Sequence, residues 1–293
     1  VNSVVRVIKQ NLKEYKIICT KSTVPIGTGG EIIKTLSNDF EEGVDFDYVS
    51  NPEFLREGSA VKDFLWPDRI IIGTTSDRAY DIMCDIYRPL YINKNPIKYT
   101  TVETAEMIKY ASNAFLALKI SYINEIANLC ETVGADIHDV ASAMGQDGRI
   151  SDKFLHPGPG FGGSCFPKDL ESLIAISKEK NIPMETLSAA KKANNNQKAK
   201  MGSKLEKLID ASLKDKKIAV LGLSFKANTD DVRESSSIDM IEFILSKGGI
   251  VRAYDPIANA SMFELFNNIS YFDDVYDAVK GADASVSYTH LTL

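Results

Sequence analysis

Hydrophobic and polar positions follow two different periods along the chain. Between residues 16 and 100, the runs "KIICT", "FDYVS" and "DRIIIGT" have the length and the β-branched content of buried strands. The stretch "SDRAYDIMCDIYRPL", which precedes a further strand-like run "IKYTT", has the spacing of an amphipathic helix. The same rhythm returns later, where the strand patterns "KIAVLGL" and "IVRAYDP" flank the helical pattern "SSSIDMIEFILSKG". Such alternation predicts a mostly parallel sheet with helices packed on it.

A long helical pattern separates these two regions. The stretch "TTVETAEMIKYASNAFLALKISYINEIANLCETVG" contains no proline, and its only glycine is the last residue. Thr100 and Glu103 have the spacing of a capping box, and Gly134 fits a C-terminal stop. At 1.5 Å per residue the helix would be about 45 Å long, which exceeds one small domain. Further helices are predicted at 136–144, 168–180 and 184–211, so the chain is expected to form two α/β domains that flank a helical middle.

Composition and charge narrow the class of protein. The chain has 293 residues, of which 44% are hydrophobic and 25% charged, as expected for a soluble protein with two domains and a real core. Its net charge of -6 argues against nucleic acid as a partner, because phosphate backbones are bound by basic surfaces. No apolar run approaches the ~18 residues of a membrane span, and no signal peptide opens the chain. We therefore expect a cytoplasmic protein with no membrane partner.

The four cysteines are widely spaced. Cys19, Cys84, Cys130 and Cys165 form no C-x-x-C pair, and the three histidines lie far apart. Neither a metal site nor a disulfide framework is expected from this spacing. Cys19, Cys84 and Cys130 are predicted to be packed thiols.

The stretch "HPGPGFGGSCFPKDL" contains a G-x-G-x-x-G at Gly158, Gly160 and Gly163. In a dinucleotide-binding loop this pattern follows a strand and opens a helix. Here no strand pattern precedes it, and two prolines remove N–H donors, so this interpretation is disfavoured.

The glycines instead lead to Cys165, which precedes a predicted helix with Pro167 at its first position. A helix N-terminus and the nearby Lys168 favour the thiolate, which is the nucleophilic form. The glycines would let the backbone come close to a substrate. The alternative is an inert thiol in the core.

A second loop follows the strand pattern "KIAVLGL". It lacks the later glycines of a dinucleotide fingerprint and offers the cations Lys226 and Arg233 instead, while Asp255 ends the next strand. A Rossmann-like βαβ unit is predicted, in which side-chain cations hold a diphosphate. A solvated charged loop is the equal alternative.

Five motifs in series carry a family resemblance. They are "KSTVPIGTG", "NPEFLREGSAVKDFLWPDRIIIGT", "AEMIKYASNAF", "FGGSCFPKD" and "GLSFKANTDDVRESSS". Together they resemble the nucleotide-sugar dehydrogenases, and among these the UDP-glucose 6-dehydrogenases, from about residue 16 to 284. Relatives acting on UDP-N-acetylmannosamine carry a different cysteine loop, whereas GDP-mannose dehydrogenases resemble this one through "FGGSCLPKD".

The resemblance implies two Rossmann-like domains joined by a long central helix and a helical dimerisation region. Residues 1–100 would be part of an NAD-binding domain, 101–205 the central helix and dimerisation region, and 206–293 a UDP-sugar-binding domain. The glycine fingerprint and acidic ribose ligand of the first domain would then lie upstream of Val1, and the end of the last domain would be missing. The terminal "SVSYTHLTL" departs from the apolar strand expected there and is a candidate for foreign sequence.

The resemblance also implies a four-electron oxidation of UDP-glucose at C6, with two NAD reduced. A water held by Asp169 and Lys109 would take the hydroxyl proton in the first oxidation. Cys165 would add to the aldehyde as a thiohemiacetal, become a thioester in the second oxidation, and be released by a water for which Glu53 is the candidate base. Lys109 and Asn113, spaced i, i+4 on one helix, would stabilise developing oxyanion charge.

Other roles are implied position by position. The implied catalytic set is Thr23, Glu53, Lys109, Asn113, Cys165 and Asp169, and the implied NAD contacts are Thr23, Glu57, Lys168 and Arg233. The implied substrate contacts are Phe54, Leu55, Lys109, Asn113, Arg149, Phe154, Leu155, Gly158, Gly160, Phe161, Gly162, Phe225 and Lys226. Arg149 would reach into a neighbouring subunit's site, which implies a homodimer or a higher oligomer.

Three alternatives stay open at this point. A 3-hydroxyacid dehydrogenase would need neither the cysteine nor a second α/β domain. GDP-mannose or a UDP-N-acetylhexosamine would be an alternative substrate for the same chemistry. A non-catalytic sugar-nucleotide-binding subunit would have no use for all six catalytic residues.

Overall fold

The computed structural model of the chain describes residues 1–90, 96–210 and 212–288. The chain divides into two compact units, Val1–Ser112 and Asn113–Leu293. The boundary between the units lies inside one helix, α5 (Val102–Val133).

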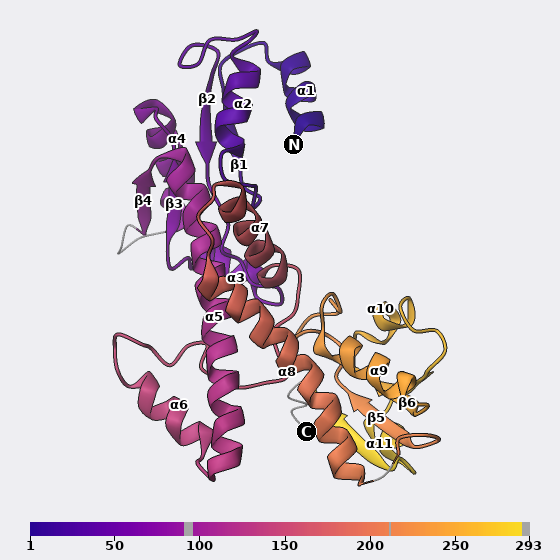
Figure 1. Cartoon of the computed structure of the whole chain (residues 1–293). Helices are drawn as coiled ribbons and strands as arrows, with labels where there is room; N and C mark the ends of the chain where they lie inside the picture. The colour runs from indigo at the N-terminus through magenta and orange to yellow at the C-terminus, as the bar shows by residue number, and fades with distance from the viewer. Residues whose placement is uncertain (91–95, 211, 289–293) are drawn as a thin grey trace. The chain divides into compact units, whose positions relative to one another are not determined.

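The first unit contains a four-stranded sheet with the strand order β1-β2-β3-β4 (Figure 1). Its strands are β1 (Lys16–Thr20), β2 (Phe46–Ser50), β3 (Ile70–Gly73) and β4 (Ile97–Thr100). The pairs β1–β2 and β3–β4 are parallel, and β2 meets β3 in antiparallel orientation at a single pair, Ser50 and Gly73. The predicted strands and the mostly parallel sheet are thus confirmed, with one antiparallel junction. The other elements are α1 (Asn2–Asn11), α2 (Thr28–Leu36), α3 (Ala60–Leu65), α4 (Asp77–Tyr87) and the 3-10 helix η1 (Arg88–Leu90).

Successive residues of β2 pack against different helices. Phe46 and Tyr48 belong to a buried cluster with Leu36 of α2, whereas Val49 belongs to another with Met83 of α4. This division follows from the strand's period of two, which sends neighbouring side chains to opposite faces of the sheet.

The predicted central helix is confirmed as α5, but its predicted cap is wrong. The carbonyl of Thr100 accepts the N–H of Thr74 beside the β3–β4 ladder, so Thr100 belongs to β4. The hydroxyl of Thr101 accepts the N–H of Thr104 at 3.3 Å and caps the helix one residue later. At the other end Gly134 has φ 75°, and the N–H of Ala135 donates to the carbonyl of Cys130 at 3.1 Å, as in a Schellman motif.

The second unit continues with α6 (Ile137–Gly145), α7 (Phe166–Glu179) and α8 (Glu185–Ile209). These helices confirm the predicted ones to within a few residues; position 211 of the predicted third helix lies outside the described residues. Cys165 is the N-cap of α7, so Pro167 is the second helical residue. The prediction that Pro167 occupies the first helical position is therefore wrong.

A second sheet, with the order β7-β6-β5-β8 and all strands parallel, lies in the same unit. Its strands are β5 (Lys217–Leu221), β6 (Ile250–Tyr254), β7 (Ser270–Tyr271) and β8 (Ala284–Ser287), and its helices are α9 (Ser236–Ser246), α10 (Asn259–Phe263) and α11 (Val275–Val279). In chain order this is 3-2-1-4, the order of a Rossmann half, and the predicted Rossmann-like unit is confirmed. The polar start of "SVSYTHLTL" forms part of β8, and residues 289–293 lie outside the described residues.

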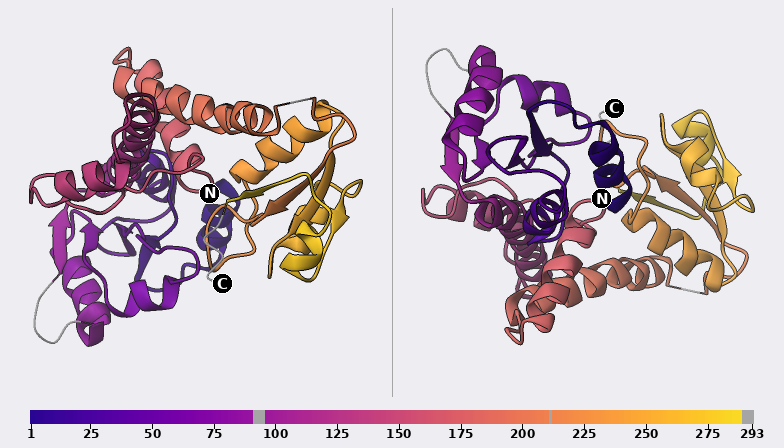
Figure 2. Two further views of the ribbon diagram at one scale, coloured as in Figure 1. Left: turned by 90° about the horizontal axis from the view of Figure 1, so that it is seen from below. Right: turned by 90° about the horizontal axis from the view of Figure 1, so that it is seen from above.

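Both faces of this sheet are covered by helices (Figure 2). Ile218 and Val220 of β5 belong to a buried cluster with Ile241 of α9, whereas Ala219 and Leu221 pack with α11 through Ala278. A strand buried on both faces reads as a continuous apolar run, which is the pattern of "KIAVLGL".

Candidate active site

Two of the predicted catalytic residues meet in the first unit. Lys109 of α5 is buried, and its Nζ donates to the carbonyl of Glu53 at 2.6 Å and lies 3.2 Å from Glu53 Oε1. The other carboxylate oxygen of Glu53 accepts the N–H of Leu55 at 2.6 Å. A buried ammonium is thus neutralised by a carboxylate that two donors hold in place.

A small cavity of about 10 Å³ adjoins this ion pair. Thr23, Lys109 and Glu106 contribute to its wall; the other lining residues are Ser22, Val24, Ser50 and Pro52. This volume is close to the minimum that one water molecule needs.

Glu106 was missed by the sequence analysis. It is 3% exposed, and its two carboxylate oxygens accept the N–H groups of Gly27 at 2.6 Å and Gly29 at 2.9 Å. Burial raises the pKa of Glu106, although the two backbone hydrogen bonds oppose that shift. It therefore joins α5 to the turn that opens α2, and its i, i+3 spacing from Lys109 was the signal that would have found it.

The remaining predicted residues of this unit follow β2. The guanidinium carbon of Arg69 lies 4.0 Å from the ring centroid of Phe54, and Lys109 Nζ lies 5.3 Å from the same centroid. Leu55 is exposed, and Glu57 is half-buried. Thr23 follows β1 and Glu53 follows β2, so these residues lie beyond the carboxyl ends of paired parallel strands, where α/β sheets bind ligands.

A second pair of predicted catalytic residues meets in the second unit. Asn113 Nδ2 donates to Asp169 Oδ2 at 2.6 Å, and both side chains are buried. Among the described residues no group hydrogen-bonds to Asp169 Oδ1; its charged neighbour is Lys168 Nζ at 3.4 Å. Asp169 is therefore a buried carboxylate with one oxygen left to accept a hydrogen bond.

Cys165 precedes Asp169 by one turn, and its carbonyl accepts the N–H of Asp169 at 2.9 Å. The thiol is free and exposed at the N-cap of α7, with Ser164 Oγ 3.7 Å from its sulfur. Cys130 is buried as predicted and Cys84 is half-buried, but the prediction of a packed thiol is wrong for Cys19, which is exposed on the edge strand β1.

The glycines before Cys165 pack against the protein itself. A Cβ atom added to Gly162 would overlap the carbonyl oxygen of Glu234, and one added to Gly163 would lie 2.6 Å from the ring of Phe225. At these two positions the close approach expected toward a substrate is made to residues of the same unit. No strand lies between α6 and α7, in accord with the rejection of a dinucleotide loop here.

The loop after β5 is organised by Asp255. Its Oδ2 accepts the N–H groups of Leu223 at 2.8 Å and Ser224 at 3.3 Å, and its Oδ1 accepts those of Ile257 and Ala258. The segment that follows carries Phe225, Lys226 and Arg233 beyond the carboxyl end of β5, next to the reversal of strand order between β5 and β8.

The other predicted residues contact neighbours within the second unit or are exposed. Lys226 Nζ lies 5.4 Å from the ring centroid of Phe225, and Arg233 forms a bidentate pair with Asp231. Arg149 is exposed and pairs with Asp147, and Lys168 is exposed. Phe154 has φ 65° and packs edge-on against Phe166 with ring centroids 6.1 Å apart, beside the buried Leu155.

The described residues contain no cluster of His, Cys, Asp and Glu arranged to hold a metal ion. None of the helices in the described part of the chain is long and apolar enough to cross a bilayer.

The strand order and the residues at the strand ends define an α/β protein of the Rossmann type, with an exposed thiol at a helix N-terminus. The chain belongs to the UDP-glucose/GDP-mannose dehydrogenase family. It matches that family's NAD binding domain at residues 1–91, its central domain at 103–196 and its UDP binding domain at 219–292. The family resemblance is therefore confirmed, whereas domain boundaries at 100 and 205 stay a prediction.

Named relatives and solved structures are similar over nearly the whole chain. It is 46% identical over 286 residues to the UDP-glucose 6-dehydrogenase of Rhizobium meliloti (strain 1021), covering 97% of this chain and 65% of the relative. It is 45% identical over 292 residues to the UDP-glucose 6-dehydrogenase TuaD of Bacillus subtilis (strain 168), covering 99% and 62%. The structure of a UDP-glucose dehydrogenase from Pyrobaculum islandicum has a TM-score of 0.90 at 36% identity, covering 98% of this chain and 66% of that one. The chain thus spans less than two thirds of the length of these relatives.

Proposed function

We propose that this chain carries catalytic parts of an NAD-dependent oxidoreductase that converts UDP-glucose to UDP-glucuronate. The observation that carries the proposal is the exposed Cys165 at the N-cap of α7, one turn before the buried Asp169–Asn113 pair. A thiol in this setting suits the capture of an aldehyde between two oxidations. The family and the names of the relatives support the choice of reaction.

NAD fits the residues beyond β1 and β2, because Thr23 and Glu57 follow the carboxyl ends of parallel strands. Lys168 and Arg233 are the further proposed contacts, and their cationic groups are suited to phosphate oxygens. Bound there, NAD supplies the hydride acceptor for both oxidations.

Asp169 is the proposed acceptor of the hydroxyl proton in the first oxidation, through a bound water. Its Oδ1 is free of hydrogen bonds from the described residues, while Asn113 fixes Oδ2. Lys109, a buried cation, would stabilise the negative charge that develops on the substrate oxygen, and Thr23 would position a water in the small cavity beside it.

Cys165 acts on the aldehyde. Its thiolate forms the sulfur–carbon bond, the carbonyl oxygen takes up a proton, and loss of that proton and of a hydride leaves a thioester. Water then adds to the thioester, the sulfur–carbon bond breaks, and the carboxylate leaves while the thiolate is regenerated. Glu53 is the proposed base for this water.

The proposed sugar-nucleotide contacts come from both units. They are Phe54, Leu55, Lys109, Asn113, Phe154, Leu155, Gly158, Gly160, Phe161, Gly162, Phe225 and Lys226. UDP-glucose is favoured over GDP-mannose or a UDP-N-acetylhexosamine because the cysteine loop reads "FGGSCFPKD".

A homodimer is proposed because one face of α5 carries exposed apolar side chains. Phe115, Tyr122, Leu129 and Val133 are all exposed, and their spacing of seven, seven and four residues places them on one stripe of the helix. A second copy of the chain would cover this stripe, and Arg149 would contribute to the neighbouring site. The cytoplasm is the proposed compartment, because it supplies NAD and sugar nucleotides and keeps Cys165 reduced.

The test is a count of NADH per sugar. Purified protein carrying this chain is given limiting UDP-glucose and excess NAD, and NADH and UDP-glucuronate are both quantified. We expect two NADH and one UDP-glucuronate per sugar, and we expect Cys165→Ala to abolish the carboxylate while Cys84→Ala retains it. One NADH per sugar from the unaltered protein, or turnover of GDP-mannose in place of UDP-glucose, would reject the proposal.

A further inference from the structure

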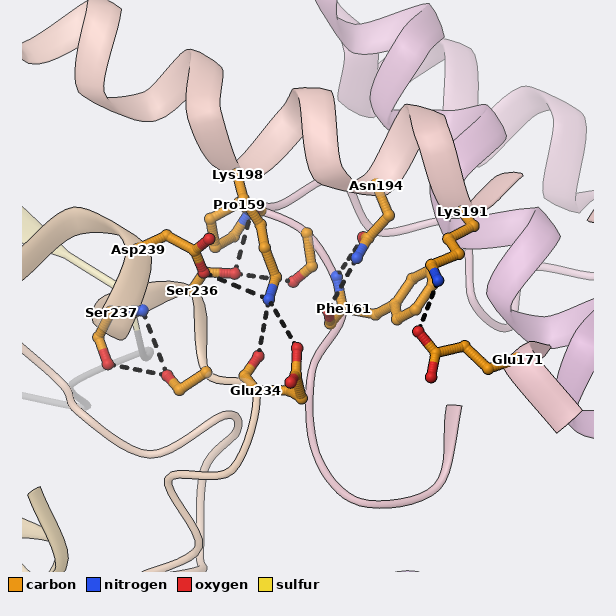
Figure 3. Close-up of polar contacts among 12 residues, drawn as sticks. Pro159, Phe161, Glu171, Lys191, Asn194, Lys198, Glu234, Ser236, Ser237 and Asp239 are labelled. Atoms are coloured by element: carbon orange, nitrogen blue, oxygen red, sulfur yellow. Dashed lines mark hydrogen bonds and ion pairs between the residues drawn. The ribbon is translucent and has the colours of Figure 1, made fainter. Parts of the chain in front are cut away.

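Polar side chains on one face of α8 hold the segment that leads to Cys165, residues 156–165, which we call the glycine loop. Asn194 Oδ1 accepts the N–H of Phe161 at 2.7 Å, and Asn194 Nδ2 donates to the carbonyl of Phe161 at 3.0 Å (Figure 3). Three residues further along the helix, Gln197 Nε2 donates to the carbonyl of Gly158 at 2.7 Å. Both amide side chains are buried, so these hydrogen bonds are shielded from water.

Lys198, on the same face, reaches a different segment. Its side chain is only 7% exposed, and Nζ donates to the carbonyl of Glu234 at 3.0 Å and lies 3.3 Å from Asp239 Oδ2 (Figure 3). Its aliphatic stem packs on the loop, since a Cβ atom at Gly160 would lie 2.9 Å from Lys198 Cγ. One side chain thus touches both the glycine loop and the segment that opens α9.

The loop and that segment also bond to each other directly. The N–H of Gly163 donates to the carbonyl of Arg233 at 2.9 Å, and Ser236 Oγ lies 3.3 Å from the carbonyl oxygens of Pro159 and Gly160. Glu234 has φ 53°, a left-handed conformation that a residue other than glycine keeps only where its surroundings hold it. The hydrogen bond from Lys198 to the Glu234 carbonyl is one such constraint.

We propose that Lys198 is a positioning residue that holds the glycine loop, with Cys165 at its end, against the segment carrying Arg233. These contacts keep the thiol of Cys165 at a constant position relative to the Arg233 guanidinium during both oxidations. Asp239 and the Glu234 carboxylate balance the buried ammonium, because an unpaired charge there would be strongly unfavourable. The inference rests on the proposed function for its catalytic consequence, but not for its structural one.

The catalytic consequence concerns the aldehyde. The first oxidation does not use the thiol, whereas the second requires Cys165 to capture the aldehyde before it leaves. A loosened loop should therefore lower the yield of the second oxidation more than that of the first. The number of NADH per sugar consumed would fall from two toward one, which a mere loss of folded protein does not cause.

The experiment compares Lys198→Met with Lys191→Met. Lys191 lies about two turns earlier on α8, and its exposed side chain pairs with Glu171 at 2.5 Å without bonding to the loop (Figure 3). Hydrogen–deuterium exchange is followed on peptides covering residues 156–166 and 229–239. We expect exchange in both segments to speed up about tenfold or more in Lys198→Met, with α6 peptides unchanged and Lys191→Met like the parent. Equal exchange in the two variants would overturn the proposal.

Asp239→Asn serves where Lys198→Met folds poorly. It removes one charge partner at a partly exposed position, and we expect a smaller acceleration, about threefold, in the same two segments. The NADH count is taken on the same samples: a fall in Lys198→Met supports the proposal, and an unchanged count of two overturns its catalytic part. Failure of the proposed function would appear separately, as a parent protein that does not oxidise UDP-glucose at all.

Discussion

At the scale of single residues, the buried face of α5 is unusually polar. Glu106, Lys109 and Asn113 follow one another at three- and four-residue intervals, and each finds its partner within the described chain. Buried polar groups cost free energy unless they are satisfied, and an apolar face would have packed the helix more simply. We infer that this face is retained for chemistry as well as for packing.

The raised pKa of Glu106 predicts how the free energy of unfolding depends on pH. Burial raises its pKa, so the folded chain binds this proton more tightly than the unfolded chain. The stability that this binding contributes is full below the ordinary glutamate pKa and is lost as the pH rises through the raised value. In Glu106→Gln that contribution is absent, and one of the two backbone donors loses its acceptor at a cost of about 1–3 kcal/mol.

The free energy of unfolding should be measured in urea for both proteins over a pH series. We expect the parent to be more stable, by a margin that narrows as the pH rises from 4.5, the ordinary value for this side chain. The matched control is Glu125→Gln, at an exposed position of the same helix. A margin that stays constant with pH would contradict the prediction.

The sequence predicts the common helix of the proposed catalytic residues Lys109 and Asn113 better than it predicts the side chains that hold the loop before Cys165. Lys109 and Asn113 stand at i, i+4 in a stretch without proline or internal glycine, so their common helix could be predicted. The stretch "KKANNNQK" is polar throughout apart from one alanine, yet Asn194, Gln197 and Lys198 are buried. Their i, i+3, i+4 spacing marks a helix face, but only the folded loop reveals that the face is covered by backbone.

At the scale of elements, the glycine loop is the connection between α6 and α7 that places Cys165. Gly158 and Gly162 look equivalent in the sequence but differ in their surroundings. Nothing lies within 4 Å of a Cβ atom at Gly158, whereas one at Gly162 would overlap the Glu234 backbone. A backbone oxygen cannot move aside as the end of a flexible side chain can.

Gly162→Ala should therefore lower the free energy of unfolding by about 1–3 kcal/mol, the usual effect of overpacking. Gly158→Ala is the control, and we expect it to be neutral or slightly stabilising because alanine restricts the unfolded chain. Urea unfolding of both variants measures the difference. Equal stability of the two would show that the loop does not pack on residues 233–236 in solution.

The first residue of a helix is not always predictable from the local sequence pattern. Thr100 and Thr101 are adjacent threonines, and either one can cap a helix by its chemistry. The choice falls on Thr101 because the backbone of Thr100 is engaged beside the β3–β4 ladder. That ladder is a tertiary contact, which local spacing does not encode.

At the scale of the whole molecule, the proposed dimer gives a test of the α5 stripe. Leu129→Glu places a charge in the middle of the exposed apolar residues, and Leu208→Glu places one on α8 at a leucine that is also exposed. We expect the parent and Leu208→Glu to sediment as dimers at micromolar concentration. Leu129→Glu should raise the dissociation constant at least about tenfold, because charged residues are depleted from interface cores. A monomeric parent would contradict the proposal.

The class of fold was predictable and the strand order was not. Alternating strand and helix patterns are sufficient to indicate an α/β protein. The order β7-β6-β5-β8, and the single antiparallel pair of Ser50 with Gly73, depend on which strands meet after long connections. Likewise β8 includes Ser285 and Ser287, and its pairing with β5 overrides their weak strand preference.

Asp255 has a consequence for how the second sheet would recognise a diphosphate. Its carboxylate already occupies the backbone donors of Leu223 and Ser224. Recognition at this sheet edge would then fall to cationic side chains such as Lys226, whose attraction is weakened by dissolved ions more than that of a buried amide cradle. Nucleotide affinity in this domain would therefore vary with ionic strength, and its measured value would depend on the buffer as much as on the fold.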